Sequence, residues 1–179
     1  MAEEAEIKEE EALSPVEEGE TELEFDVNMS SGILYDYLLR HSYSSAVGLL
    51  GSCFGAFGII VFAMSKSWLY LIMGLIVLLY LPVTLFKRSK IVIITNPSFK
   101  KPLHYCFYEK GFTVSQDDAK SVMEWGGCTK AVSTKKSIII YTGKNNASIF
   151  PREQIPGGAA DLISLIAKHM EPKKVKIRY

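Results

Sequence analysis

The sequence contains few of the residue types that most often carry chemistry. It has three cysteines and three histidines among 179 residues. The cysteines form no CxxC pair, and the histidines form no HExxH pattern. A GxSxG nucleophile motif and a Walker-type glycine-rich loop are also missing. These absences argue against a metal-dependent, nucleophilic or nucleotide-using enzyme, and we expect no catalytic residues, no metal and no cofactor.

One pair of potential ligands remains. His104 and Cys106 are two residues apart on an expected strand and would share a face. No second ligand pair stands near them in the sequence, so ordinary packing is the preferred interpretation for Cys106 and for Cys128. A Cys106–Cys128 disulfide is compatible with the sequence but is not expected in a reducing compartment.

Charged residues are missing from two long apolar stretches, residues 46–64 and 68–86. Each has 19 residues. At about 1.5 Å of rise per residue, that length matches a hydrocarbon core of roughly 30 Å. The link between them, residues 65–67, is too short to pass through another domain. We therefore predict two antiparallel transmembrane helices, and the lack of charge inside them argues against an ion or proton pathway.

A basic start before an apolar run, typical of a cleaved signal peptide, is also missing. Residues 1–26 hold 12 acidic side chains and one lysine, a net charge of −11. Residues 87–179 hold 17 Lys and Arg against 7 Asp and Glu, a net charge of +10. We predict a disordered acidic tail over residues 1–24 and an extended, amphipathic lead-in over residues 25–45. The first apolar helix would then act as an uncleaved signal anchor.

Cations are concentrated on one side of the two expected helices. A basic juxtamembrane linker, residues 87–102, holds Lys87, Arg88, Lys90, Lys100 and Lys101. The turn holds only Lys66. The positive-inside rule predicts a multi-pass protein of the plasma membrane, with both termini cytoplasmic and residues 65–67 outside. Two interpretations stay open for the five cations: a topology signal, or a site for anionic lipid headgroups.

Small residues form a row along the first apolar helix. They include a GxxxG pair and its neighbours: Gly51, Gly55, Gly48 and Ser52. Small residues let helix backbones approach closely in a membrane. The preferred interpretation is packing on the second helix near Gly74, and the alternative is a homodimer through the face that carries Gly51 and Gly55.

Beyond residue 103 the apolar period changes to two. The pattern predicts about five short antiparallel strands, with one at residues 121–134 that bends at Gly126–Gly127, and then an amphipathic helix over residues 159–170. A basic tail, residues 172–179, would close the chain. The expected fold class is a membrane α-hairpin plus a small α+β domain, residues 103–171.

Four short segments of this region recur in the same order in a known family: Tyr108–Phe112 (YEKGF), Glu124-Trp125, Ile138–Tyr141 (IIIY) and Ile149–Arg152 (IFPR). On these segments the chain resembles the YcxB-like family of bacterial membrane proteins over residues 23–170. The resemblance implies a pleckstrin-homology-like fold for the C-terminal domain and no established enzymatic activity. Of the motif residues, Trp125 suits the domain core, Pro151 a strand end, and Arg152 a surface or capping position.

The sequence therefore predicts a non-enzymatic, membrane-tethered interaction or regulatory module. An accessory subunit of a larger membrane complex is the alternative. The expected partners are the lipid bilayer, anionic lipid headgroups, a second copy of the chain or an unidentified protein. Nucleic acid is not expected, because the strands lack an interleaved aromatic and basic pattern. The acidic tail is a candidate to fold back onto the basic domain and mask it.

Overall fold

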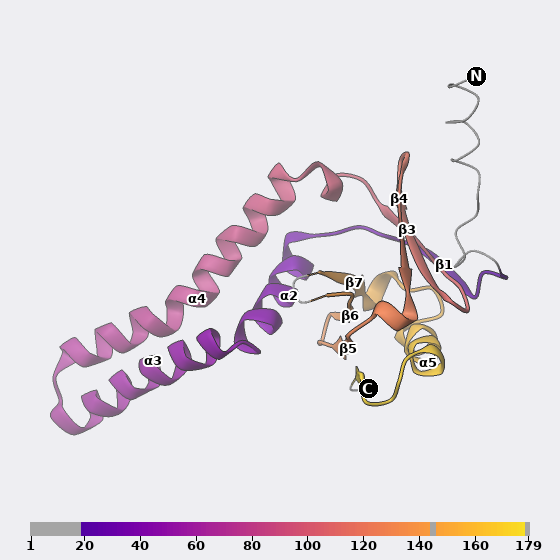
Figure 1. Ribbon diagram of the computed structural model, residues 1–179. Coiled ribbons are helices and arrows are strands. Elements are labelled where there is room, and N and C mark those ends of the chain that lie inside the picture. Colours follow the sequence, from indigo (N-terminus) through magenta and orange to yellow (C-terminus); the bar gives the residue numbers. More distant parts are fainter. Residues whose placement is uncertain (1–18, 144–145, 178–179) are drawn as a thin grey trace, which may run out of the picture. The chain divides into compact units, whose positions relative to one another are not determined.

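The computed structural model describes residues 19–143 and 146–177 (Figure 1). These residues form two compact units, which we call the helical unit and the strand unit. The helical unit is residues 29–100. The strand unit is formed by the two segments that flank it, residues 19–28 and 101–177. Residues 1–18 of the expected acidic tail lie outside the described residues.

The helical unit has three helices: α2 (Ser31–Tyr43), α3 (Ala46–Ser65) and α4 (Trp68–Thr95). The Ser30 and Ser45 hydroxyls cap α2 and α3 by accepting hydrogen bonds from backbone N–H groups three residues on. Lys66 ends α3 in the left-handed conformation, with φ of 56°. This cap reverses the chain within three residues, so α3 and α4 pack as a hairpin.

Helix α4 continues past its expected end at Phe86 and stops at Thr95. Lys87, Arg88 and Lys90 therefore lie on a helix and not in an irregular linker. The sequence supports this continuation, because residues 91–94 are apolar and the first helix breaker after them is Pro97.

The first sheet of the strand unit has the order β1-β2-β3-β4, with antiparallel neighbours throughout. Its strands are β1 (Leu23–Val27), β2 (Leu103–Phe107), β3 (Gly111–Gln116) and β4 (Ala119–Glu124). Leu23 lies opposite Phe107, and Val27 lies opposite Leu103. The chain thus forms β1, leaves to build the whole helical unit, and returns to place β2 beside β1.

The second sheet has the order β7-β6-β5-β8. Its strands are β5 (Lys130–Ser133), β6 (Ser137–Tyr141), β7 (Ala147–Pro151) and β8 (Val175–Lys176). The first three are antiparallel, and β8 adds to β5 in parallel. Helix α5 (Ala159–His169) follows β7 and buries its four aliphatic side chains, Leu162, Ile163, Leu165 and Ile166.

The domain expected at residues 103–171 holds six strands, close to the expected count of about five, and β1 and β8 on either side of it bring the described residues to eight. The strand expected at residues 121–134 is two strands, β4 and β5, in different sheets. A 3₁₀ turn at Trp125–Gly127 separates them, at the glycines where a bend was expected. β1 begins in the expected acidic tail, residues 1–24, and ends in the expected lead-in, whereas β8 lies in the expected basic tail. Both are short, and each needs a partner that is distant in sequence.

An aromatic core joins the two sheets. Phe25 of β1, Tyr105 and Phe107 of β2, and Phe112 of β3 all contact Phe150 of β7, with ring centroids 4.9–6.3 Å apart. Each of these side chains is at most 5% exposed. Burial raises the pKa of Tyr105 to about 12. Because Phe25 belongs to this core, residues 23–27 are part of the domain and not a lead-in to the helices.

Candidate functional site

The α3–α4 hairpin of the helical unit exposes most of its apolar side chains. Within the apolar length of each hairpin helix, only 11% of the residues are buried inside the protein, and both helices have the length and composition to cross a membrane. Phe54, Phe57, Met64 and Trp68 are 62–82% exposed. A soluble protein rarely exposes a continuous apolar surface of this size.

The hairpin closes on three glycines. A Cβ atom added to Gly58 would lie 2.9 Å from Gly74 Cα, and one added to Gly74 would lie 2.8 Å from Gly55 O. These distances are shorter than real Cβ contacts, so only glycine permits this approach. Part of the small-residue row therefore packs against α4 at Gly74.

The remainder of the small-residue row borders a groove. Gly48 lies so close to the Ser42 backbone that a Cβ atom would overlap it, whereas Gly51 has nothing within 4 Å of its Cβ position. Gly48 and Gly51 line an apolar groove of about 400 Å³ together with Ser52 and residues 76–78, 80 and 81 of α4.

The five cations of the expected basic linker lie in both units. Lys87, Arg88, Lys90 and Lys100 are exposed residues of the helical unit. Lys90 places its ammonium 4.5 Å from the centre of the Phe86 ring. Lys101 belongs to the strand unit, where its ammonium lies 2.7 Å from the Asp117 carboxylate.

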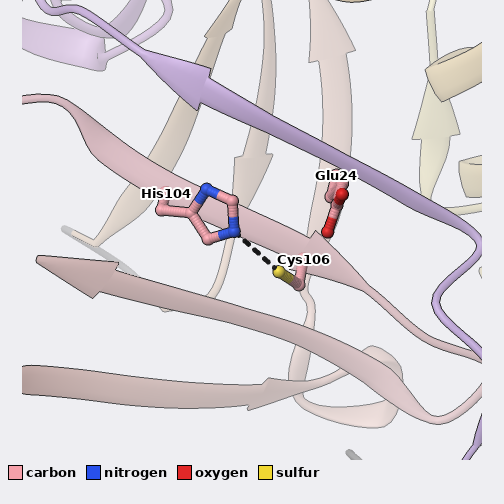
Figure 2. A group of neighbouring side chains, drawn as sticks. All are labelled: Glu24, His104 and Cys106. Atoms are coloured by element: carbon pink, nitrogen blue, oxygen red, sulfur yellow. Dashed lines mark hydrogen bonds between the residues drawn. The ribbon is translucent and has the colours of Figure 1, made fainter.

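Four polar side chains meet on the outer face of the β1–β2 pair. The register places Glu24 opposite Cys106 and Asp26 opposite His104. Cys106 Sγ lies 3.1 Å from His104 Nε2, and Asp26 Oδ1 lies 2.7 Å from His104 Nδ1. Figure 2 shows the Glu24 carboxylate next to this pair, on the neighbouring strand. We call these four residues the β1–β2 cluster.

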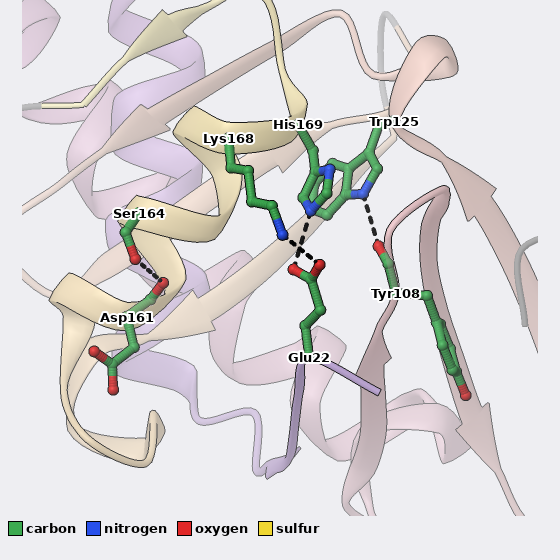
Figure 3. A network of polar contacts seen from close by, with 7 residues as sticks. All are labelled: Glu22, Tyr108, Trp125, Asp161, Ser164, Lys168 and His169. Carbon is green, nitrogen blue, oxygen red and sulfur yellow. Dashed lines mark hydrogen bonds and ion pairs between the residues drawn. The ribbon is translucent and has the colours of Figure 1, made fainter. Parts of the chain in front are cut away.

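A second polar network lies where β1 approaches the end of α5 (Figure 3). Glu22 accepts hydrogen bonds from Lys168 Nζ at 2.7 Å and from His169 Nε2 at 3.0 Å. The His169 ring stacks on Trp125, with centroids 5.6 Å apart and planes 9° apart. The Trp125 indole N–H donates to Tyr108 O at 3.0 Å. We call Glu22, Lys168, His169 and Trp125 the Glu22 network.

Two side chains of this network change the pKa of the carboxylate. The hydrogen bonds from Lys168 and His169 hold the pKa of Glu22 below its usual 4.5. A shallow groove of about 380 Å³ runs beside the ion pair and is lined by Glu22, Leu23, Asp161, Ser164, Leu165 and Lys168. Charges of both signs therefore line this groove.

The three motif residues of the domain occupy different environments. Trp125 is 5% exposed and contacts the rings of Phe107 and Phe112, which places it in the core. Pro151 is buried at the end of β7. Arg152 begins the turn that follows, and its backbone N–H donates to Lys136 O at 2.9 Å.

A comparison with known protein families gives a match within the strand unit. Residues 107–167 match the model of the YcxB-like protein family. The resemblance predicted from the four sequence segments is thereby confirmed over these residues. A comparison with curated proteins and one with solved structures give no match.

The YcxB-like match spans β3 to β7 and most of α5, and it includes Trp125, Pro151 and Arg152. It does not include β1, the helices α2, α3 and α4, or His104 and Cys106. The β1–β2 cluster therefore depends on residues outside the matched region.

The sequence indicates His104 and Cys106 as possible metal ligands but shows no further ligands near them. The missing groups are Glu24 and Asp26, which precede the hairpin. The signal was present as the alternation of apolar and acidic residues over residues 23–27, because such a strand places both carboxylates on one face. Nothing local indicated which strand would pair with it. All three cysteines are free thiols. Burial raises the pKa of Cys128 to about 11.

Proposed function

We propose that this protein is a non-enzymatic, membrane-tethered interaction module whose α3–α4 hairpin crosses the plasma membrane. The observation that carries the proposal is the apolar surface of the hairpin, of which only a small fraction is buried within the protein. In a bilayer this surface contacts lipid tails, and the helical backbone satisfies its own hydrogen bonds.

The pairing of β1 with β2 supports a topology with both ends of the hairpin on one side. β1 precedes the hairpin, β2 follows it, and the two strands share a sheet. A single crossing would separate them by the bilayer, whereas two crossings return the chain to the same side. The excess of lysine and arginine outside the hairpin makes that side the cytoplasm.

The order of elements supports a pleckstrin-homology-like fold for the strand unit. A meander of four strands is followed by a meander of three strands and then by a helix, α5. In this proposal the helical unit is an insertion between the first two strands of the domain, and β8 is an addition after its helix.

The exposed cations at the end of α4 support a role at the membrane surface. Lys87, Arg88 and Lys90 would lie at the level of the cytoplasmic headgroups if the preceding part of α4 spans the bilayer. Each cation near an anionic leaflet contributes about 1 kcal/mol of attraction. We therefore propose anionic phospholipid as a ligand of this region. An accessory role in a larger membrane complex would use the same tether, with a protein partner for the strand unit.

Cysteine accessibility tests the topology. In a full-length background with Cys53, Cys106 and Cys128 replaced by serine, single K66C and K135C variants report on the hairpin turn and on the strand unit. A membrane-impermeant maleimide added to intact cells should label K66C and spare K135C, and lysis should expose K135C. Labelling of both positions before lysis, or of K135C alone, would contradict the proposal.

Retention of lipid tests the surface role. Full-length protein in detergent is mixed with equal amounts of anionic and neutral phospholipid, and bound lipid is measured by native mass spectrometry. We expect anionic lipid to be enriched on the wild-type chain and reduced several-fold on K87Q/K90Q. The matched control K135Q/K136Q removes the same charge from exposed positions of the strand unit. Equal retention by both variants would reject the lipid site and leave the cations as a topology signal.

A further inference from the structure

The β1–β2 cluster brings three kinds of metal-binding atom to one point. In a strand, alternate side chains share a face. Glu24 and Asp26 therefore project from one face of β1, and His104 and Cys106 project from the same face of β2. Phe25 and Tyr105, the residues between them, point into the core.

The distances within the cluster suit a tetrahedral ion. One ligand atom from each of Glu24, His104 and Cys106 lies within 4.8 Å of the other two. Cys106 Sγ lies 3.1 Å from His104 Nε2. Zinc bonds of about 2.0–2.3 Å separate tetrahedral ligand atoms by about 3.5 Å. Small side-chain rotations would therefore bring all three atoms into coordination distance.

Asp26 prepares the histidine for this role. A carboxylate only accepts hydrogen bonds, so the 2.7 Å contact places the imidazole proton on His104 Nδ1. In the neutral ring the lone pair is then on Nε2, the atom that faces Cys106. A carboxylate behind the distal nitrogen is the usual partner of a metal-binding histidine, where it fixes the ring and its tautomer.

We propose that Glu24, His104 and Cys106 bind a zinc-type divalent transition metal ion, with Asp26 as the second-shell partner of His104. The mixture of thiolate, imidazole and carboxylate favours Zn²⁺ over Mg²⁺ or Ca²⁺, which prefer oxygen ligands. On binding, the Cys106 S–H bond breaks, its proton passes to solvent, and the thiolate sulfur bonds to the metal. Water would fill the fourth position.

The same residues also resemble a Cys–His–Asp nucleophile arrangement, and two observations favour the metal. The Glu24 carboxylate lies beside the thiol, where its charge opposes formation of a bare thiolate, whereas a cation between the two groups removes that repulsion. The side chains of His104 and Asp26 are 45% and 61% exposed, and neither groove described above includes them. A nucleophile would need a site that holds substrate.

The metal would act as a clip between two distant parts of the chain. Its ligands come from β1, before the helical unit, and from β2, after it. Binding would therefore fasten the edge strand β1 to its sheet and stabilise the strand unit. This inference is independent of the proposed lipid site.

Cobalt titration of the full-length protein in detergent, under a non-thiol reductant, tests the proposal. We expect one Co²⁺ per chain, with thiolate-to-cobalt charge-transfer absorption and the intense visible bands of a tetrahedral ion, both removed by Zn²⁺. C106S should abolish the charge-transfer band, and H104Q should weaken binding strongly. D26N should weaken it about 10–100-fold, as expected for a second-shell carboxylate.

The matched control is C128S, which removes a buried cysteine of the same unit and should leave the cobalt spectrum unchanged. Circular dichroism confirms that each variant is folded. Zn²⁺ should also raise the melting temperature of the wild-type chain and not that of C106S. A charge-transfer band that persists in folded C106S would overturn the proposal. So would the absence of binding together with rapid alkylation of Cys106 that H104Q slows, which would indicate a nucleophilic thiol.

Discussion

Glu22 shows how a single acidic residue gains a structural role from its position. Its backbone N–H donates to Phe107 O, which continues the β1–β2 ladder by one residue. Its carboxylate joins Lys168 and His169, which are 62% and 9% exposed in their side chains. One residue thus fastens the start of β1 both to β2 and to the end of α5.

This contact predicts a pH-dependent effect of E22Q. Because the pKa of Glu22 is lowered in the folded state, its stabilising contribution is present above the unfolded value of 4.5 and is lost as pH falls through the folded value. We expect E22Q to reduce the free energy of unfolding by about 1 kcal/mol at pH 7, as for a partly exposed ion pair. The difference from wild type should shrink progressively below pH 4.5.

The fluorescence of Trp125 during chemical denaturation measures this effect, in a background where W68F removes the other tryptophan. E20Q removes the same charge at the neighbouring exposed acidic position and should have little effect. A destabilisation by E22Q that stays constant down to pH 3 would show that the lost contact is not electrostatic.

At the scale of elements, the hairpin depends on backbone contact and not on large side chains. Gly55, Gly58 and Gly74 bring α3 and α4 together where any Cβ atom would overlap the other helix. In the proposed membrane setting, such contacts would replace the hydrophobic drive for association, which is missing between helices in lipid. The open position of Gly51 leaves part of the same helix available to a partner.

We therefore expect G74A to destabilise the hairpin and G51A to have no such effect. The added methyl group at residue 74 must push the helices apart, with a cost of about 1–3 kcal/mol, as for other overpacked sites. Thermal unfolding in detergent, followed by circular dichroism, compares the two. If a second copy packs on Gly51, G51A should instead reduce dimer cross-linking while monomer stability is unchanged. Equal melting temperatures for G74A and wild type would contradict the close packing.

The elements that could be predicted are those with a local signal. Two uncharged 19-residue stretches indicated α3 and α4, and the spacing of Leu162, Ile163, Leu165 and Ile166 indicated α5. Alternation indicated most of the strands after residue 103. Residues 125–127 were harder, because a glycine pair is compatible both with a bulge inside one strand and with a turn between sheets. The turn forms because Trp125 packs in the core against residues that are distant in sequence.

What could not be predicted is pairing between distant segments. The sequence predicts Phe25 and Val27 as part of an extended, amphipathic lead-in, although they are core residues with 5% and 0% exposure. Their partners on β2 lie beyond the entire helical unit. The periodicity within either segment does not indicate that the two segments pair. For the same reason the candidate metal ligands appeared as an isolated pair, His104 and Cys106.

For the whole molecule, the main consequence is that the strand unit is discontinuous in sequence. A fragment that starts at residue 101 lacks β1, so β2 becomes an edge and the core loses Phe25 and Val27. Each lost side chain removes about 1.5–3 kcal/mol of burial. Exposed hydrophobic edges also promote aggregation.

We expect a soluble, folded domain when residues 29–100 are replaced by a short Gly/Ser linker. Val27 lies opposite Leu103, so the linker has only to close a hairpin between neighbouring antiparallel strands. Size-exclusion chromatography and the dispersion of amide NMR signals should show a monomer with native-like packing. The matched fragment of residues 101–177 alone should aggregate or give poorly dispersed signals. Equal behaviour of the two proteins would mean that β1 is dispensable.

The insertion of the helices between β1 and β2 also sets an order of events during biosynthesis. β1 leaves the ribosome first and has no partner until β2 emerges, after both long helices have been made. Closing so long a loop in a flexible chain is entropically costly, whereas a hairpin already seated in the bilayer returns the chain to the side it came from. Membrane insertion would then come before the first sheet can form, and a chain that fails to insert would leave β1 and β2 unpaired, a form that quality-control proteases can recognise.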